Sequence, residues 1–345
     1  MPRQSIYSLN QEGLKSILTQ WGLPAFHSRQ IFAWLYKKKT ESFSAMSNLP
    51  AVLRQRLQEN FFFSELELKK RLASSDGTEK FLLKLSDGNL IEAVAIPAAG
   101  RVTACLSTQA GCKYACKFCA SGKLGFKRNL DASEIIAELL LLMKHSAHPK
   151  ITHIVFMGVG EPLDNYANLL KAIRIINDKD GLNIGARRIT ISTCGVVPGI
   201  KRLSQEGLQV ELSVSLHAAT DEKRSLLMPV NKKYPLKELI QTCREYIQET
   251  NRQITFEYVL IRGFNSSLQD AEVLSKIMQG LRLAKVNLIP SNIVEGNVVL
   301  PPEKAAVMSF RDYLIKKGVP ATLRKARGED IEAACGQLRL RYEKI

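Results

Sequence analysis

Three cysteines stand close together at CxxxCxxC spacing, namely Cys112, Cys116 and Cys119, and Phe118 precedes the last of them. Three thiolates can hold three irons of a [4Fe–4S] cluster and leave the fourth iron open to a substrate or cofactor. A ferredoxin-type run would add a nearby cysteine followed by proline, but residues 120–122 read Ala-Ser-Gly. The spacing therefore favours an open iron–sulfur cluster.

A structural zinc site is the alternative interpretation of the same loop. Zinc usually takes four ligands, which come in CxxC-type pairs. No histidine or cysteine follows the loop within easy reach, so the loop fits zinc less well than an open cluster.

The composition is that of an ordinary globular protein. Of the 345 residues, 45% are hydrophobic and 24% are charged, and no apolar run approaches the length of a membrane span. The first ten residues contain no apolar stretch of the kind found in signal peptides. We therefore expect a cytoplasmic protein without a membrane partner. In that reducing compartment, seven cysteines indicate metal binding or catalysis rather than a disulfide framework.

The net charge of +16 favours a polyanionic partner, and nucleic acid is the first candidate. The alternative is a basic enzyme whose charge serves only solubility. Basic side chains in predicted loops are expected to contact phosphates, together with the N-terminal helices. They are Lys123, Lys127, Arg128, Arg187, Arg188, Arg324 and Lys325.

Hydrophobic periodicity divides the chain into regions. Residues 1–60 have helical spacing. Apolar runs at 81–85 and 90–96 flank Asp87-Gly88, which predicts a β-hairpin. From residue 102 strands and helices alternate. The expected strands are 102–107, 151–157, 188–193, 210–216, 254–261, 285–289 and 321–324, and the expected helices include 200–206, 236–249, 268–281 and 302–317.

Repeated βα units imply a parallel sheet with right-handed crossovers. We therefore predict an α/β fold whose core, at 101–330, is a partial (β/α)6-type TIM barrel. A small N-terminal helical accessory domain at 1–60 and a β-hairpin extension at 61–100 would precede it. A C-terminal segment at 331–345 would follow.

The polar motifs fall where predicted barrel strands end, and loops at that rim carry the chemistry in such folds. Gly160 would let the backbone approach a ligand closely, and Glu161 could accept from a cationic amine. Ser192 and Asn292 could bind a ribose or carboxylate. His217 is either a ligand contact or a strand-end histidine with a structural role.

Two further thiols stand out. Cys105 lies within the first barrel strand, and Cys335 precedes a glycine near the C-terminus. Cys335 is either a reactive thiol or a buried apolar cysteine, which is the usual state of a free cysteine. Cys194 and Cys243 are assigned to the buried kind.

These residues resemble a known family. The cysteine spacing with an aromatic before the last cysteine resembles the radical S-adenosylmethionine (SAM) superfamily. Other stretches are similar to the RlmN/Cfr family of RNA adenosine methyltransferases, and they are 105–112, 125–130, 157–162, 215–217, 228–231 and 330–338. The similarity runs from about residue 10 to the C-terminus. It implies that the partial barrel is a radical SAM core.

The resemblance implies two cofactors. Cys112, Cys116 and Cys119 would hold one [4Fe–4S] cluster per chain. SAM, used twice per turnover, would chelate the open iron through its amino and carboxylate groups. The positions that match the family's SAM-binding residues are Gly160, Glu161, Ser192, Ser215, Leu216, His217 and Asn292.

The implied reaction runs through Cys335. One SAM would methylate this thiol, and a second would be cleaved by one electron to a radical that takes hydrogen from the new methyl group. The carbon radical would add to adenine, and Cys105 would resolve the protein–RNA link as a Cys105–Cys335 disulfide. Glu92 matches a carboxylate proposed to take part in proton transfer. A radical route suits adenine carbon 2, which is not a nucleophile.

Within the family, Glu161-Pro162 and residues 324–328 look more like RlmN than Cfr. The implied function is methylation of carbon 2 of adenosine in the peptidyl transferase region of 23S rRNA and of the adenosine 3′ to the anticodon in tRNAs. The implied partners are these RNAs, an electron donor such as flavodoxin and a thiol reductant for the disulfide. A monomer is expected. Ser291 and Cys194 depart from the usual aromatic and serine, which concerns the pocket rim.

Three alternatives remain open at this point. A Cfr-like enzyme would methylate carbon 8 of the ribosomal adenosine. A non-catalytic iron–sulfur or zinc RNA-binding protein would cleave no SAM. A radical SAM enzyme acting on a protein or small molecule is disfavoured by the positive charge and by the pair Cys105 and Cys335.

Overall fold

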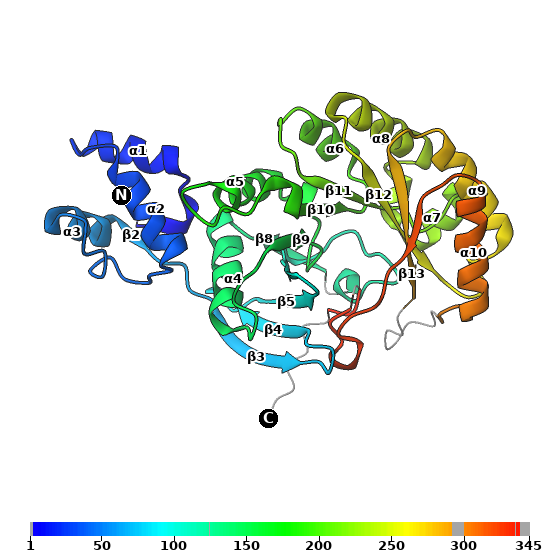
Figure 1. Cartoon of the computed structure of the whole chain (residues 1–345), viewed down its shortest axis with the longest axis horizontal. Helices are drawn as coiled ribbons and strands as arrows, with labels where there is room; N and C mark the ends of the chain where they lie inside the picture. The colour runs from blue at the N-terminus through cyan, green and yellow to red at the C-terminus, as the bar shows by residue number, and fades with distance from the viewer. Residues whose placement is uncertain (1–2, 124, 292–299, 335, 339–345) are drawn as a thin grey trace.

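The computed structural model describes residues 3–123, 125–291, 300–334 and 336–338, and its centre is a mixed β-sheet (Figure 1). In these residues the sheet has ten strands in the order β14-β13-β12-β11-β10-β9-β6-β5-β4-β3. From β6 to β14 every neighbouring pair is parallel. The bounds of these strands are β6 Arg101–Cys105, β9 His153–Phe156, β10 Ile189–Thr193, β11 Glu211–Ser215, β12 Ile254–Leu260, β13 Ala284–Pro290 and β14 Ala321–Leu323.

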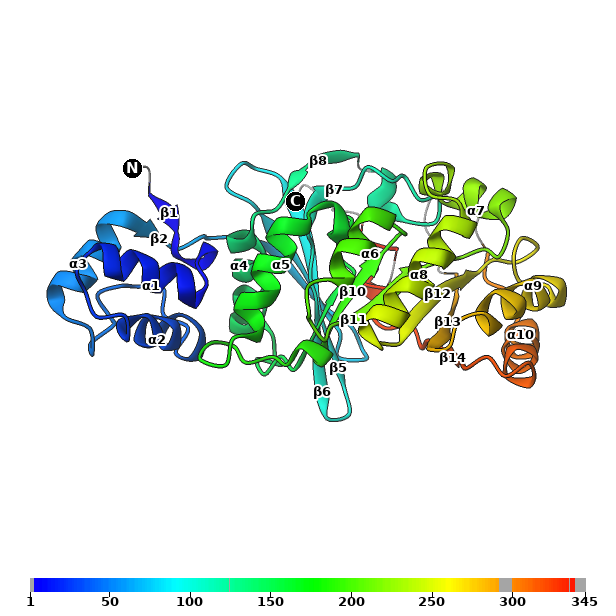
Figure 2. The same ribbon diagram turned by 90° about the horizontal axis from the view of Figure 1, so that it is seen from above.

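Helices cover the outer face of the parallel strands (Figure 2). One helix follows each strand from β6 to β13, and a short additional helix, α7, follows β11. The helices are α4 Ala132–His145, α5 Tyr166–Asn177, α6 Val197–Ser204, α7 Asp221–Leu227, α8 Leu236–Thr250, α9 Leu268–Gln279 and α10 Lys304–Lys316. The predicted partial (β/α)6 barrel is confirmed. None of the helices in the described parts of the chain combines the length and apolarity needed to cross a membrane.

Each barrel strand has an apolar outer face and a polar inner face. In β12, Ile254, Phe256 and Tyr258 are fully buried in the core beneath the helices, whereas Thr255 and Glu257 line a cavity inside the barrel. Closed barrels commonly fill this interior with branched apolar side chains. Here the polar inner face leaves space for a ligand.

The N-terminal residues form the expected helical region. Asn10 caps α1 by accepting a hydrogen bond from the Gly13 amide at 2.8 Å. A short parallel pair of strands, β1 and β2, adds to the helices. The elements are β1 Gln4–Ser5, a 3-10 turn Ile6–Ser8, α1 Gln11–Gln20, α2 His27–Phe32, a π-helical turn Ala33–Lys37, α3 Ala51–Asn60 and β2 Phe61–Phe62.

The predicted hairpin is present but is part of a larger arm. β4 (Glu79–Lys84) and β5 (Leu90–Ala98) pair antiparallel around residues 85–89. A further strand, β3 (Glu67–Ala73), pairs with β4, and β5 pairs antiparallel with β6. The hairpin is therefore continuous with the barrel sheet, and β3, β4 and β5 are called the arm below.

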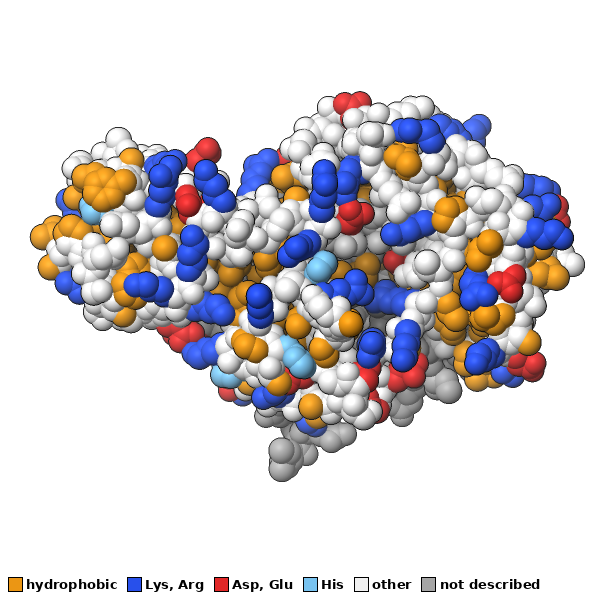
Figure 3. Space-filling view, in the orientation of Figure 1, with side chains coloured by type: hydrophobic (Ala, Val, Ile, Leu, Met, Phe, Trp, Pro, Cys, Tyr) orange, Lys and Arg blue, Asp and Glu red, His pale blue; other side chains and the backbone are white. Residues whose placement is uncertain are grey.

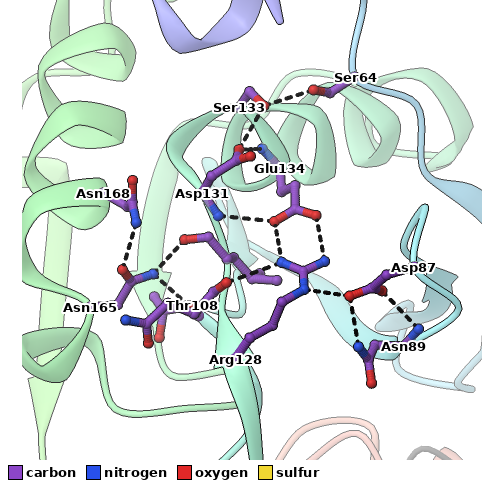
Figure 4. Close-up of polar contacts among 12 residues, drawn as sticks. Ser64, Asp87, Asn89, Thr108, Arg128, Asp131, Ser133, Glu134, Asn165 and Asn168 are labelled. Atoms are coloured by element: carbon purple, nitrogen blue, oxygen red, sulfur yellow. Dashed lines mark hydrogen bonds and ion pairs between the residues drawn. The ribbon is translucent and has the colours of Figure 1, made fainter. Parts of the chain in front are cut away.

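Two short strands that the sequence did not indicate, β7 (Gln109–Gly111) and β8 (Phe126–Asn129), flank the cysteine loop. Arg128 in β8 forms a two-pronged ion pair with Glu134 at the start of α4, with both N–O distances 2.8 Å, and also contacts Asp87 in the hairpin turn (Figure 4). These two carboxylates raise the pKa of Arg128. Arg128 thus fixes the cysteine loop to the barrel and the arm, and the phosphate contact expected of it stays a prediction.

The N-terminus of α4 is fixed by the predicted capping box. The Asp131 carboxylate accepts from the Glu134 amide at 2.9 Å, and Glu134 accepts from the Asp131 amide at 2.9 Å. We predict that Asp131→Ala lowers the free energy of unfolding by about 1 kcal/mol because one helix amide loses its acceptor. Urea unfolding measures the loss, and Asp131→Asn, which keeps an acceptor, should restore most of it. Equal losses in both variants would contradict the capping role.

Candidate active site

The loops at the carboxyl ends of the barrel strands enclose a cleft, as expected. Residues from the cysteine loop and from the ends of β9, β10 and β11 line it together. Of the predicted site residues it contains Cys112, Cys116, Cys119, Gly160, Glu161, Ser192, Ser215 and His217. Leu216 is buried beside it, and Asn292 and Cys335 lie outside the described residues.

The cysteine loop is shaped by tight turns. Gly111 has φ of +74°, and a Cβ there would stand 1.7 Å from the Gly125 carbonyl oxygen, so no other residue fits. The Cys119 amide donates to the Cys116 carbonyl at 3.1 Å, and the Cys112 amide donates to Gly125 at 3.2 Å. The loop is thereby folded back so that its thiols share one wall of the cleft.

The three thiols fit a cluster in type and location. Burial, together with the neighbouring thiols Cys119 and Cys112, raises the pKa of Cys116. Among the described residues, no three Cys, His, Asp or Glu side chains are already gathered as metal ligands. Binding a cluster requires the thiols to lose their protons.

Glu161 is a buried acceptor at the rim. Its Oε1 accepts from the Leu163 amide at 3.0 Å, and its Oε2 accepts from the Cys194 amide at 2.7 Å. Burial raises its pKa. Glu161 thus ties the loop after β9 to the end of β10 while its carboxylate lines the cleft. Cys194 is buried, as assigned, and it also lines the same cleft, in line with its expected effect on the pocket rim.

His217 has a fixed orientation and charge. It has φ of +57°, and its Nδ1 accepts from the Val259 amide at 3.0 Å. The neutral ring must therefore carry its proton on Nε2. The ring meets Phe118 edge to face, with centroids 4.5 Å apart. The ring has a structural role through this hydrogen bond, and it also lines the cleft, where the ligand contact stays a prediction.

Arg224 is a functional residue that the sequence did not reveal. It is fully buried, and its guanidinium donates to the carbonyls of Cys194 at 2.7 Å, Ser215 at 3.2 Å and Leu216 at 3.2 Å. It also donates to Asn231 Oδ1 at 2.8 Å. This one side chain fixes the ends of β10 and β11, and its charge acts on the Cys116 thiol. Arginine is rarely fully buried, so the residue type alone gives no reason to expect Arg224 inside the protein.

A second cavity lies inside the barrel and opens on the side opposite the cysteine loop. Cys105 and Ala334 line it, whereas Gly336 lines the cleft. The two cavities share the inner-face residues Glu257 and Arg324, whose side chains are 3.9 Å apart. The two cavities are therefore neighbours within the barrel, with this ion pair in the wall between them.

Glu92 lies apart from the cleft, on the arm. It is 3% exposed, and its Oε1 is 3.5 Å from Nζ of Lys80. Val94, two residues further along β5, packs with Cys105 and Ala333. The structure thus brings Glu92 and Cys105 to the same side of the sheet as the described part of the C-terminal segment.

The comparisons with known proteins agree with this geometry. Residues 106–272 match the family model described as the radical SAM superfamily, and residues 4–63 match the one described as the ribosomal RNA large subunit methyltransferase N-terminal domain. A probable dual-specificity RNA methyltransferase RlmN from Akkermansia muciniphila is 48% identical, with 99% of this chain and 97% of the relative covered. Another from Clostridium novyi is 44% identical over 98% of each chain.

A solved structure matches over nearly the whole chain. The crystal structure of a radical SAM methyltransferase from Sphaerobacter thermophilus is 42% identical and superposes with a TM-score of 0.92, covering 98% of this chain and 100% of that one. The fold and cysteine loop are those of a radical SAM enzyme, which uses a [4Fe–4S] cluster and SAM. Within that class, the chain belongs to the RlmN family.

We predict that stability decreases as the pH falls below about 6.5 because of His217. Burial lowers its pKa from 6.5 to about 3, so the folded ring stays neutral where the unfolded chain binds a proton. Its stabilising contribution is complete above pH 6.5 and is lost progressively as the pH falls toward 3. Urea unfolding at a series of pH values measures this slope. His217→Gln should flatten it across that window, and an unchanged slope would show that the ring is not the group responsible.

Proposed function

We propose that this enzyme methylates carbon 2 of adenosine in the peptidyl transferase region of 23S rRNA and of the adenosine 3′ to the anticodon in tRNAs. The relatives named above are RNA methyltransferases of dual specificity, which supports both substrates. The observation that carries the proposal is that the interior cavity lies next to the cysteine-lined cleft and shares Glu257 and Arg324 with it. A cofactor at the rim and a base entering from the opposite side would meet beside the C-terminal segment.

The cofactors, when bound, supply a methyl group and the one-electron cleavage of SAM. Cys112, Cys116 and Cys119 would hold the cluster, and Gly160, Glu161, Ser192, Ser215, Leu216, His217 and Asn292 would surround SAM. The Cys116 and Cys119 thiols at the cleft wall and the fixed neutral ring of His217 are consistent with these roles.

The chain's own residues would carry the methyl group and the proton. Cys335 would carry the methyl group. Cys105 would then attack the Cys335 sulfur of the protein–RNA adduct, which leaves a Cys105–Cys335 disulfide and releases the RNA. Cys105 is buried and lines the interior cavity. Glu92 would accept the proton that leaves carbon 2. An electron donor such as flavodoxin and a thiol reductant would complete the cycle in the cytoplasm, with the enzyme acting as a monomer.

Basic side chains around the interior cavity would guide RNA to it. Figure 3 shows Lys and Arg side chains gathered around a hollow in the middle of the face seen in that view. Those lining the cavity are Arg101, Arg187, Arg188, Lys285, Arg324, Lys325 and Arg327. The expected phosphate contacts Arg187, Arg188, Arg324 and Lys325 are among them. A target base would leave its stack to reach the barrel interior.

The function is tested with anaerobically reconstituted enzyme, methyl-labelled SAM, a reductant and unmodified 23S rRNA or tRNA. We expect label on Cys335 and 2-methyladenosine in both RNAs by mass spectrometry of digests. Cys335→Ala should abolish RNA methylation, and Cys105→Ala should leave RNA linked to protein. Label at carbon 8 would assign the Cfr-like reaction instead. An intact cluster with neither label would refute the proposed substrate.

We predict that Arg187→Glu/Arg188→Glu weakens RNA binding by at least about tenfold in 0.1 M salt, because two phosphate contacts are lost. The slope of log K against log salt should also become shallower. Fluorescence anisotropy with a labelled tRNA measures both. Lys316→Glu/Lys317→Glu, at the exposed end of α10, is the control with the same net charge. Equal weakening in both variants would mean that only total charge matters.

A further inference from the structure

A buried lysine joins two parts of the molecule that are far apart in sequence. Lys80 in β4 is 8% exposed, and its Nζ is 3.5 Å from Glu92 Oε1. The same Nζ donates a hydrogen bond to the carbonyl oxygen of Glu332 at 3.1 Å. Glu332 precedes Cys335 by three residues. One ammonium group therefore contacts both the proposed proton acceptor and the segment that leads to the proposed methyl carrier.

The charge of Lys80 has a direct consequence for Glu92. A carboxylate as buried as Glu92 favours its neutral form unless a cation or hydrogen bonds stabilise the charge. Only the ionised form can accept a proton. Lys80 supplies a cation within ion-pair distance, and the pair is buried on both sides. Removing the lysine would leave a buried carboxylate without this compensation, whereas removing both charges would not.

The arm also holds the start of the same segment. In the β3–β4 turn, the Asp76 carboxylate accepts from the Gly328 amide at 3.2 Å and lies 3.7 Å from Arg327 Nη1. The Ser75 amide donates to Asp330 Oδ2 at 3.1 Å. These contacts fix where the segment begins, so that Lys80 acts on backbone that is already docked.

The far side of the segment is held by the cysteine loop. The Ala120 amide donates to the Gly336 carbonyl at 2.7 Å, and the Ser121 hydroxyl donates to the Leu338 carbonyl at 3.2 Å. Lys80 therefore contacts the segment from the sheet, at a point between the segment's two anchored ends. Its position allows it to set the distance between the segment and Glu92.

We propose that Lys80 is a positioning residue for methyl transfer, which holds Glu92 in a buried ion pair and fixes the segment before Cys335 relative to it. The roles of Glu92 and Cys335 in this inference rest on the proposed function. The contacts of Lys80 do not, and they can be tested without cofactors or RNA.

Hydrogen exchange tests the segment directly in the purified chain. We expect Lys80→Met to speed amide exchange in peptides covering 328–334 by at least about tenfold, because local opening loses one anchor. Lys84→Met is the matched control, since Lys84 ends the same strand and its half-exposed side chain lies 3.8 Å from Glu67. Equal exchange in both variants would overturn the role of Lys80 in holding the segment.

A double-mutant cycle tests the coupling to Glu92. Lys80→Met should lower the urea midpoint more than Lys80→Met/Glu92→Gln does, because the second change removes the buried charge that Lys80 paired with. Additive losses would overturn the coupling. In single-turnover assays, Lys80→Met should slow methyl transfer to RNA by at least about tenfold, and Lys80→Arg should recover part of the rate. If wild-type enzyme transfers no methyl group, the proposed function fails, while the exchange and unfolding results still decide the role of Lys80.

Discussion

The buried guanidinium of Arg224 is the interaction on which the rim of the barrel depends. Strand ends in a parallel sheet leave carbonyl groups without ladder partners, and those of Cys194, Ser215 and Leu216 all turn toward this one side chain. A planar guanidinium with donors in a fixed fork can satisfy several acceptors at once, which a lysine ammonium cannot do in the same geometry. The ends of β10 and β11 are thereby held apart at a set spacing. The cleft that a cofactor must enter keeps its shape because these backbone groups cannot relax toward one another.

The inner face of the barrel can be polar because the apolar core lies on the other face of the sheet. Core packing is satisfied between the sheet and the outer helices, where Ile191, Leu212 and Phe256 are almost fully buried. The opposite face of each strand is therefore free to carry polar groups such as Glu257, which accepts from Asn287 Nδ2 at 2.8 Å. A charged group there requires partners, and neighbouring strands provide them in register. The result is a cavity with polar and basic lining inside the barrel, next to the cleft at the rim, as a reaction between a bound cofactor and an entering base requires.

The sequence predicted the repeating part of the fold well because each βα unit buries one continuous apolar face. It missed β3, whose residues Lys69-Lys70-Arg71 hide the alternation and whose ladder is interrupted between Leu68 and Lys70. Charged residues are common on such edge strands, where they discourage association with other chains. It also missed β7 and β8, which are too short to show a period. The convergence of the cysteine loop, Glu161 and His217 was predictable from strand order alone, since parallel strands end at one rim.

The sequence could not show which charged residues are removed from solvent by contacts in the folded protein. Lys80 and Arg128 look alike in sequence, as basic residues within or next to strands, yet one lies beneath the C-terminal segment and the other bridges two carboxylates. Their roles come from contacts across 252 residues in the first case and across 41 and 6 residues in the second, which no local pattern encodes. The arm likewise acts through contacts between residues that are far apart in the sequence. By continuing the barrel sheet beyond β6, it supplies a surface for the end of the chain, so residues at opposite ends of the sequence can act at a fixed separation. A segment anchored only by its covalent link would pay the entropy of ordering at every turnover. Docked on the arm and tied to the cysteine loop, the segment has most of that ordering built into the fold.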